Sequence, residues 1–264
     1  HLLAECFKIA FADRTAHMGD PAEMTVPVEW LISADYAAQR WASIHMERAG
    51  CPVAGIPPSP EATSTTHVTA ADADGSVASI TQTINEGFGS KVMVPGTGLL
   101  LDNTMALFDP HPGHLNSVGP SKRMVGSNSP TIISKNGKPY MALGTPGGVR
   151  IFPSVAQAIV NVISHGMTLQ EAVEAPRVWT QSQELEVESA VPESVQSGLS
   201  GRGHDVLEVR TVAGGMNGVI FDHDTGMITG AVCWRADGAP IALSGGPARL
   251  GVRFRPTVSR NDKT

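Results

Sequence analysis

Two adjacent threonines stand where a polar, proline-bearing run becomes strand-like, in SPEATSTTHVTAADADG from Ser59 to Gly75. A threonine hydroxyl is a weak nucleophile that needs a base, and a free α-amine on the same residue is one such base. Its ordinary pKa of about 8 suits proton transfer near neutrality. This chemistry at Thr65 requires that the polypeptide chain be cut immediately before Thr65. A proline-rich loop that leads into a strand is a suitable place for such a cut. The alternative is ordinary strand chemistry, since threonines favour strands and pair across them.

A hairpin is predicted to position these threonines. The alternating segments THVTAA and SVASITQTIN flank DADG, a strong turn signal. Pairing about this turn places Thr65 and Thr66 beside Thr81, Gln82 and Thr83, within a residue or two of register. The loop-to-strand junction therefore lies against a row of hydroxyl groups.

A second hairpin, with the turn KNGK, is predicted to position backbone hydrogen-bond donors. Its pairing places Ser127 and Asn128 opposite the run TPGG, which ends in Gly147 and Gly148. Two glycines that lead into a helix present backbone N–H groups without side chains in the way, an arrangement that suits a developing oxyanion. The alternative is a sharp strand-to-helix turn.

The remaining pattern predicts an α+β protein rather than a parallel doubly wound sheet. Helical spacing covers 1–14, and Ser33 is a predicted N-cap for a helix that ends at Gly50. A third helix is predicted from Ser154 to His165. The run TLQE is a capping box that opens a short helix closed by Pro176. Short strands and turns follow, including ELEVES, DVLEVRT, GVIFD and MITGAVC.

Composition excludes several classes of partner and cofactor. The 264 residues carry 19 basic and 25 acidic side chains without a basic block, which argues against nucleic acid as a partner. The apolar runs are too short to span a bilayer. Three cysteines make neither a disulfide framework nor a CxxC pair, and no metal or cofactor motif is present, so we expect no cofactor.

Several blocks together resemble the γ-glutamyltransferase family of N-terminal-nucleophile hydrolases. They are AECFKIAFADRTAHMGDP, STTHVTAADADGSVASITQTINEGFGS, GTGLLLDNTMALFDP, SPTIISKNGKPYMALGTPGGVRI and GMTLQEAVEAPRV, in family order over nearly the whole chain. The resemblance implies a four-layer α-β-β-α sandwich. It also implies a precursor that cuts itself, here between Ser64 and Thr65, into a large and a small subunit.

The resemblance also implies roles for individual residues. Thr65 matches the nucleophile, and Thr83 matches the threonine that tunes it. Gly147 and Gly148 match the oxyanion-hole glycines. The expected substrate-binding residues are Asn85, Thr104, Ser127 and Asn128. Asn85 matches an asparagine near the α-amino end of the substrate. Ser127 matches the second of a serine pair that holds the substrate carboxylate.

Four departures from the family pattern bear on the substrate. Thr104 and Leu107 replace the Gln or Glu and the Asp that bind the substrate's α-amino group, and Gly126 replaces the first serine of the pair. The segment DPHPGHLNSVGPSKR is shorter than the lid-bearing loop of typical family members, which predicts an open site. The run GAVCWRADG stands where many members have a DPR-like run. Cleavage of γ-glutamyl amides, as in glutathione hydrolysis, is the family default. The alternatives are an acylase acting on glutaryl or other small acyl amides, and a non-catalytic family member.

The resemblance divides the chain into two parts. Residues 1–64 correspond to the tail of the large subunit and end in a proline-rich linker at about 51–64, and residues 65–264 correspond to the small subunit. Because the chain begins inside a helical pattern, we expect it to be the C-terminal part of a longer precursor whose N-terminal part is its partner. The sequence assigns no compartment and fits both a periplasmic or extracellular and a cytoplasmic setting.

Overall fold

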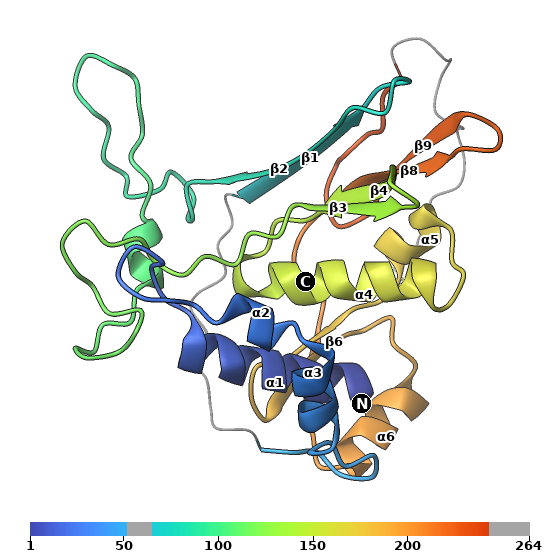
Figure 1. Cartoon of the computed structure of the whole chain (residues 1–264), viewed down its shortest axis with the longest axis horizontal. Helices are drawn as coiled ribbons and strands as arrows, with labels where there is room; N and C mark the ends of the chain where they lie inside the picture. Colours follow the sequence, from blue (N-terminus) through green and yellow to red (C-terminus); the bar gives the residue numbers. More distant parts are fainter. Residues whose placement is uncertain (52–64, 243–264) are drawn as a thin grey trace, which may run out of the picture.

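Two sheets, one lying over the other, form the centre of the computed structural model, which describes residues 1–51 and 65–242 (Figure 1). The first is a hairpin of β1 (Thr65–Ala71) and β2 (Val77–Thr83). The second has the strand order β3-β4-β8-β9. Its strands are β3 (Thr131–Lys135), β4 (Lys138–Gly144), β8 (Asn217–Asp222) and β9 (Met227–Val232).

Helices cover the other face of the four-stranded sheet. These are α4 (Ile151–Ile163) and α5 (Leu169–Glu174), which pack on β4, β8 and β9 (Figure 1). Their apolar faces meet those strands in the main core, which contains Leu143, Val155, Val173 and Met216. These described residues thus form three stacked layers, which are the helices, the four-stranded sheet and the hairpin that begins with Thr65.

A third sheet forms a separate layer beside the N-terminal helix α1 (Leu2–His17). It contains β5 (Val178–Trp179), β6 (Glu184–Glu188) and β7 (Asp205–Val209), with α6 (Glu193–Gly201) between β6 and β7. Ala4 of α1 packs with Leu185, Val187 and Leu199 in a second core cluster. The remaining elements are the short helices α2 (Val28–Leu31), α3 (Ala34–Trp41), η1 (Thr104–Leu107) and η2 (Gly148–Arg150).

Both predicted hairpins are confirmed, because their turns are encoded locally. Thr65 pairs with Thr83, one residue from the predicted register. In the second turn Asn136 and Gly137 both have positive φ, at 53° and 75°, as a type I′ turn requires. The capping box of Thr168 and Glu171 is also present. Helices with mainly antiparallel sheets confirm the α+β class.

Two expectations about secondary structure are wrong. The helix capped by Ser33 ends at Trp41 rather than at Gly50. Backbone groups beyond it are held by distant residues instead, since Arg202 donates to the Met46 carbonyl and Ala49 donates to the Arg202 carbonyl. The β6–β7 pair is parallel and is connected through α6, a helix that the strand-and-turn interpretation missed. The predicted linker 51–64 lies outside the described residues apart from Cys51.

A buried charged cluster joins the third sheet to the main one. The Glu188 carboxylate, 1% exposed, accepts hydrogen bonds from the backbone N–H groups of Arg177 and Val212 and from the Arg235 guanidinium. The Arg177 guanidinium donates in turn to the carbonyls of Val212 and Gly214. Burial, together with the neighbouring Arg235 charge, lowers the Arg177 pKa to about 10. The cluster thereby fixes the turn at 212–214.

We expect Glu188→Gln in the full-length protein to lower the free energy of unfolding by about 3 kcal/mol, because two buried guanidinium groups lose their counterion. Urea unfolding measures the change. Glu184→Gln, at an exposed position of the same strand, is the matched control and should change stability by less than about 0.5 kcal/mol. Equal unfolding midpoints for the two variants would contradict this role of Glu188.

Candidate active site

Thr65 and Thr83 meet at the open end of the first hairpin. The Thr65 hydroxyl donates a hydrogen bond to Thr83 Oγ1 at 2.8 Å, and Thr83 Oγ1 also accepts from the Asn85 backbone N–H at 2.8 Å. Thr65 is half-buried, whereas Thr66 points to the other face and is exposed. The structure therefore brings together the predicted nucleophile and its predicted tuning threonine, and separates Thr65 from its neighbour.

Asn85 lies directly after this strand end and links it to a distant segment. It is buried and has a φ of 72°, in the left-handed region that asparagine tolerates better than most residues. Its amide donates to the Asn103 carbonyl at 3.4 Å, and Asn103 Oδ1 accepts from the Glu86 N–H at 3.1 Å. These contacts place the start of η1, which contains Thr104 and Leu107, beside the end of β2.

The side chain of Thr104 is engaged within its own turn. Its backbone N–H and its hydroxyl both donate to Asp102 Oδ1. These hydrogen bonds lower the pKa of the exposed Asp102 carboxyl group. The anionic group in this turn is therefore Asp102, a residue that sequence reasoning did not single out, although the aspartate in LLDN, where the family pattern has asparagine, was a visible signal.

Gly147 and Gly148 form a tight turn into α4. Their φ angles are 139° and 56°, which favour glycine, and among the described residues neither backbone N–H has an acceptor. A Cβ on Gly147 would lie 2.5 Å from the Ala213 Cβ, so a side chain has no room there. The Gly214 N–H donates to the Pro146 carbonyl at 2.9 Å, which ties the glycine turn to the turn held by the charged cluster.

Ser127 and Asn128 lie outside the strand pairing that was expected to place them. The β3–β4 ladder begins with Thr131 opposite Leu143, so the pairing does not extend to the glycine turn. Ser127 is half-buried and Asn128 is exposed. Their segment is held instead by the N-terminal region, since Arg14 donates to the Val125 carbonyl at 2.9 Å.

Two hollows on the described surface lie away from these residues. One, of about 260 Å³, lies between the end of α1 and the segment around Asp109 and Asn116. Another, of about 280 Å³, lies beside the turns that follow β1 and β8. Neither is lined by Thr65 or by the glycine turn. In the part of the chain that the structure describes, Thr65 and Thr83 lie at the open end of the first hairpin.

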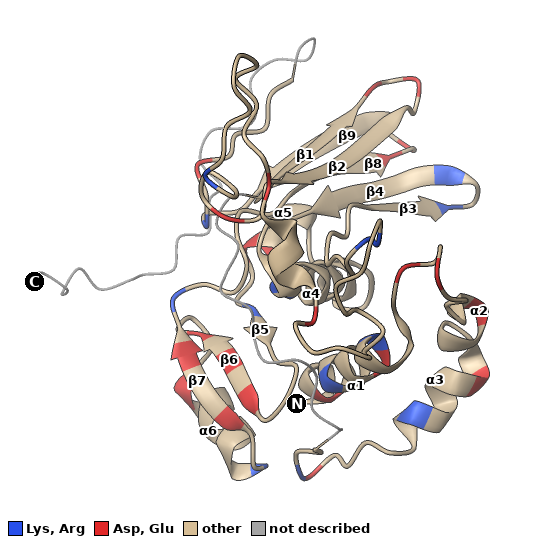
Figure 2. Cartoon of the chain, turned by 90° about the vertical axis from the view of Figure 1, so that its left-hand side faces the viewer, with Lys and Arg blue, Asp and Glu red and all other residues tan. Residues whose placement is uncertain are grey.

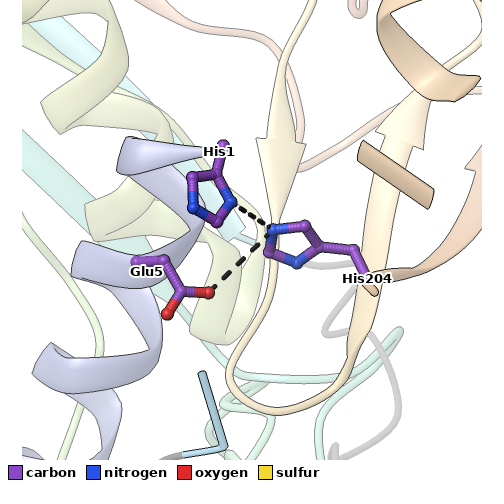
Figure 3. A group of neighbouring side chains, drawn as sticks. All are labelled: His1, Glu5 and His204. Carbon is purple, nitrogen blue, oxygen red and sulfur yellow. Dashed lines mark hydrogen bonds and ion pairs between the residues drawn. The ribbon is translucent and has the colours of Figure 1, made fainter. Parts of the chain in front are cut away.

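Three potential metal ligands gather elsewhere, where α1 meets the loop before β7 (Figure 3). His1 Nδ1 lies 2.8 Å from His204 Nε2, and Glu5 Oε1 lies 3.9 Å from the same atom. The Lys8 ammonium group is fully buried in this cluster, 2.9 Å from Glu5 Oε1 and 3.4 Å from His204 Nδ1. Because Lys8 already supplies the cation that balances Glu5, the cluster is explained as a buried ion pair.

Charged side chains are unevenly distributed. Acidic side chains gather on β6 and β7, whereas lysines and arginines are scattered over helices and turns (Figure 2). This agrees with the absence of a basic block in the sequence. Among the helices that the structure describes, none is both long and apolar enough to cross a bilayer.

Comparison with known proteins identifies the class to which this fold and site belong. The model of the gamma-glutamyltranspeptidase family matches residues 1–243. The chain therefore belongs to the gamma-glutamyltranspeptidase family, as the sequence blocks predicted. The described residues are mixed helix and sheet, as expected for its N-terminal-nucleophile fold.

Particular relatives are of two kinds. The chain is 55% identical to the Acylase ACY 1 proenzyme of Pseudomonas sp. (strain SE83), covering 96% of this chain and 45% of that protein. It is 36% identical to the Glutathione hydrolase proenzyme of Bacillus subtilis (strain 168), and this match covers 92% of this chain and 44% of that protein. The cephalosporin acylase structure from Bacillus halodurans matches with a TM-score of 0.82 and 32% identity. This match covers 92% of this chain and 45% of the acylase chain. The chain thus spans about half the length of these relatives.

The buried His204 predicts a pH dependence of stability. Burial, and next the Lys8 charge, lowers its pKa from 6.5 to about 4, while Glu5 opposes and Arg202 reinforces the shift. The unfolded chain binds this proton more tightly, so the stability is fully present above about pH 6.5 and is lost as the pH falls towards 4. We expect His204→Gln to reduce the stability difference between pH 7 and pH 5 in urea unfolding.

The exposed His165→Gln is the matched control for this measurement and should keep the wild-type pH dependence. A His204→Gln variant whose stability falls with pH in parallel with the wild type would contradict the assignment.

Proposed function

We propose that this chain carries the catalytic part of an amide hydrolase that cuts itself between Ser64 and Thr65 and then uses Thr65 as its nucleophile. The observation that carries the proposal is the 2.8 Å hydrogen bond from the Thr65 hydroxyl to Thr83 at the first residue of a strand. Membership of a family whose relatives are named as proenzymes supports the cut. Before the cut the Thr65 nitrogen is an amide, which is not a base.

The proposed reaction has two stages. The released Thr65 amine takes the hydroxyl proton as Oγ attacks the amide carbonyl, and the tetrahedral oxyanion faces the N–H groups of Gly147 and Gly148. The C–N bond breaks, the leaving amine takes the proton, and an acyl-threonine ester remains. Water, or an acceptor amine, then attacks the ester and regenerates the Thr65 hydroxyl. The Thr83 hydroxyl orients Oγ throughout.

We infer that the acyl group carries a terminal carboxylate but no α-ammonium group, as a glutaryl group does. Two observations favour this acylase activity over γ-glutamyl cleavage. The identity to an acylase proenzyme is 55%, against 36% for a glutathione hydrolase proenzyme. In addition, Leu107 offers no charge to an ammonium group, and the Thr104 hydroxyl is already bonded to Asp102. Ser127, with Asn128, is the proposed contact for the terminal carboxylate.

A γ-glutamyl substrate is the second candidate, and Asp102 is the observation that favours it. This exposed carboxylate lies two residues from Thr104, and its pKa is lowered by hydrogen bonds from Thr104, which keeps it anionic. An aspartate at this place could bind an ammonium group that Thr104 and Leu107 do not. The two candidates therefore predict different effects of removing the Asp102 charge, since only γ-glutamyl turnover should depend on it.

We further propose that the site is completed by polypeptide outside this chain. Val68 and Ile80 are large apolar residues on the outer face of the first hairpin, and they are 56% and 55% exposed. A further layer there would complete the four-layer sandwich expected for the family. In this proposal residues 1–64 end the large subunit, and the cut leaves residues 65–264 as the small subunit.

Self-cleavage is tested by denaturing gel electrophoresis of the full-length protein. We expect the wild type to give two fragments, one beginning at Thr65 by N-terminal sequencing, and Thr65→Ala to remain one chain. Thr83→Val removes the hydroxyl that orients Thr65 and should slow both cleavage and turnover by about 100-fold. Thr66→Val, on the exposed face, is the control. A wild type that stays uncut like Thr65→Ala would support a non-catalytic member instead.

The acyl group is tested by the turnover of glutaryl- and γ-glutamyl-p-nitroanilide. We expect the glutaryl compound to have the higher kcat/KM. The double variant Thr104→Glu, Leu107→Asp should shift the ratio towards γ-glutamyl by about 30-fold or more, the equivalent of about 2 kcal/mol for a desolvated charge pair. Asp102→Asn should leave glutaryl turnover intact. Faster γ-glutamyl turnover that collapses in Asp102→Asn would establish the second candidate.

A further inference from the structure

The imidazole of His67 is enclosed between the two stacked sheets. It belongs to the strand that begins with Thr65, and only 5% of the residue is exposed. Its Nδ1 shares a hydrogen bond with Thr81 Oγ1 at 2.8 Å, and its Nε2 shares one with Thr69 Oγ1 at 3.1 Å. Both partners lie on the same hairpin, so the ring nitrogens are satisfied there and the ring face is left for packing.

That ring face lies on the backbone of Gly144, the last residue of β4. A Cβ built on Gly144 would lie 2.2 Å from Cε1, 2.5 Å from Nδ1 and 2.6 Å from Nε2 of His67. Contacts this short to three ring atoms mean that the added carbon would overlap the ring, so that the ring or the Gly144 backbone would have to move. The φ angle of Gly144 is not positive, so glycine is needed here for space and not for its backbone angles.

Polar contacts fix the two strands around this ring. The Asn217 side chain donates to the His67 carbonyl at 2.7 Å, and Asn217 pairs with Gly144 in the β4–β8 ladder. On the other strand of the hairpin, the Ser79 hydroxyl donates to the Leu143 carbonyl at 3.3 Å. The ring is therefore a spacer of fixed thickness at the centre of the contact between the two sheets.

The position of this spacer connects the two halves of the candidate site. His67 lies two residues after Thr65, and Gly144 lies three residues before Gly147. Burial lowers the His67 pKa to about 4, so the ring is neutral near neutral pH. With both nitrogens engaged by hydroxyl groups of its own hairpin, the ring has the environment of a packing group rather than of an acid or a base.

We propose that His67 is a positioning residue whose ring, packed on the Gly144 backbone, sets the separation between the Thr65 hydroxyl and the N–H groups of Gly147 and Gly148. This role rests on the proposed function. A displacement of about 1 Å between a nucleophile and its oxyanion donors can cost about 100-fold in rate. The thickness of one aromatic ring thus controls the rate of the acyl transfer.

The test uses full-length Gly144→Ala, His67→Ala and the double variant. In Gly144→Ala the new methyl group collides with the ring, and we expect kcat to fall by about 10- to 100-fold with little change in KM. His67→Ala removes the spacer and should lower kcat similarly. In the double variant the methyl group occupies space that the ring leaves, so kcat should exceed the value expected from multiplying the two single effects.

Gly201→Ala is the matched control, since a Cβ there meets nothing within 4 Å and the residue lies at the end of the distant α6. It should keep wild-type kcat. Thermal unfolding of every variant separates positioning from stability, because a purely structural role would lower the melting temperature and leave kcat unchanged below it. The pH profile of kcat in His67→Ala should keep the wild-type shape.

Three outcomes would overturn the role of His67. They are wild-type kcat in Gly144→Ala, strictly multiplicative effects in the double variant, and loss of a titrating limb from the pH profile of His67→Ala, which would make the ring an acid or a base. A cut and active wild type with any of these results leaves the proposed function standing. An uncut and inactive wild type would overturn the proposed function, and this role with it.

Discussion

The candidate site depends on the contact between two sheets, because its two halves are remote in sequence. Thr65 begins the hairpin β1–β2, and the glycine turn follows β4 of the four-stranded sheet. No local interaction of either segment could bring them together. The hydrogen bonds from Asn217 to the His67 carbonyl and from Ser79 to the Leu143 carbonyl, with the ring of His67 between them, align the two strands. The geometry of the candidate site is therefore set by the packing of the two sheets.

The donor half of the site has a second support, in the buried charges. Arg177 and Glu188 hold the turn at 212–214, where Ala213 has a φ of 60°, a strained value for a residue with a Cβ. That alanine fills the space beside Gly147, and the neighbouring Gly214 donates to Pro146. Rigid preorganisation of oxyanion donors is valuable because donors that need not reorient stabilise developing charge at no further cost.

The sequence predicted the features that are encoded locally and missed those set by distant contacts. Both hairpins and the capping box followed from turn and cap residues, and with them the Thr65–Thr83 pair. The helix expected to reach Gly50 ends at Trp41, and the residues after it are held by distant side chains, as when Lys8 and Gln183 donate to the Gly50 carbonyl. The parallel β6–β7 pair and the packing of His67 on Gly144 also depend on tertiary contacts that no local pattern reveals.

The chemical machinery and the groups expected to select the acyl group belong to different kinds of structure. Thr65, Thr83 and Gly147 are held by strands and by the packing between them. Thr104 and Leu107 lie on a single 3₁₀ turn, after a long connection that Asn103 ties to the end of β2. Substitutions on such a turn leave the sheets unchanged, since loops tolerate change that a packed core does not. A family built this way can exchange the charge that meets an α-ammonium group while it keeps its nucleophile. For this reason the presence of Thr104 and Leu107, where the family pattern has the residues expected to bind an α-amino group, supports the proposal of a different acyl group and not of a loss of activity.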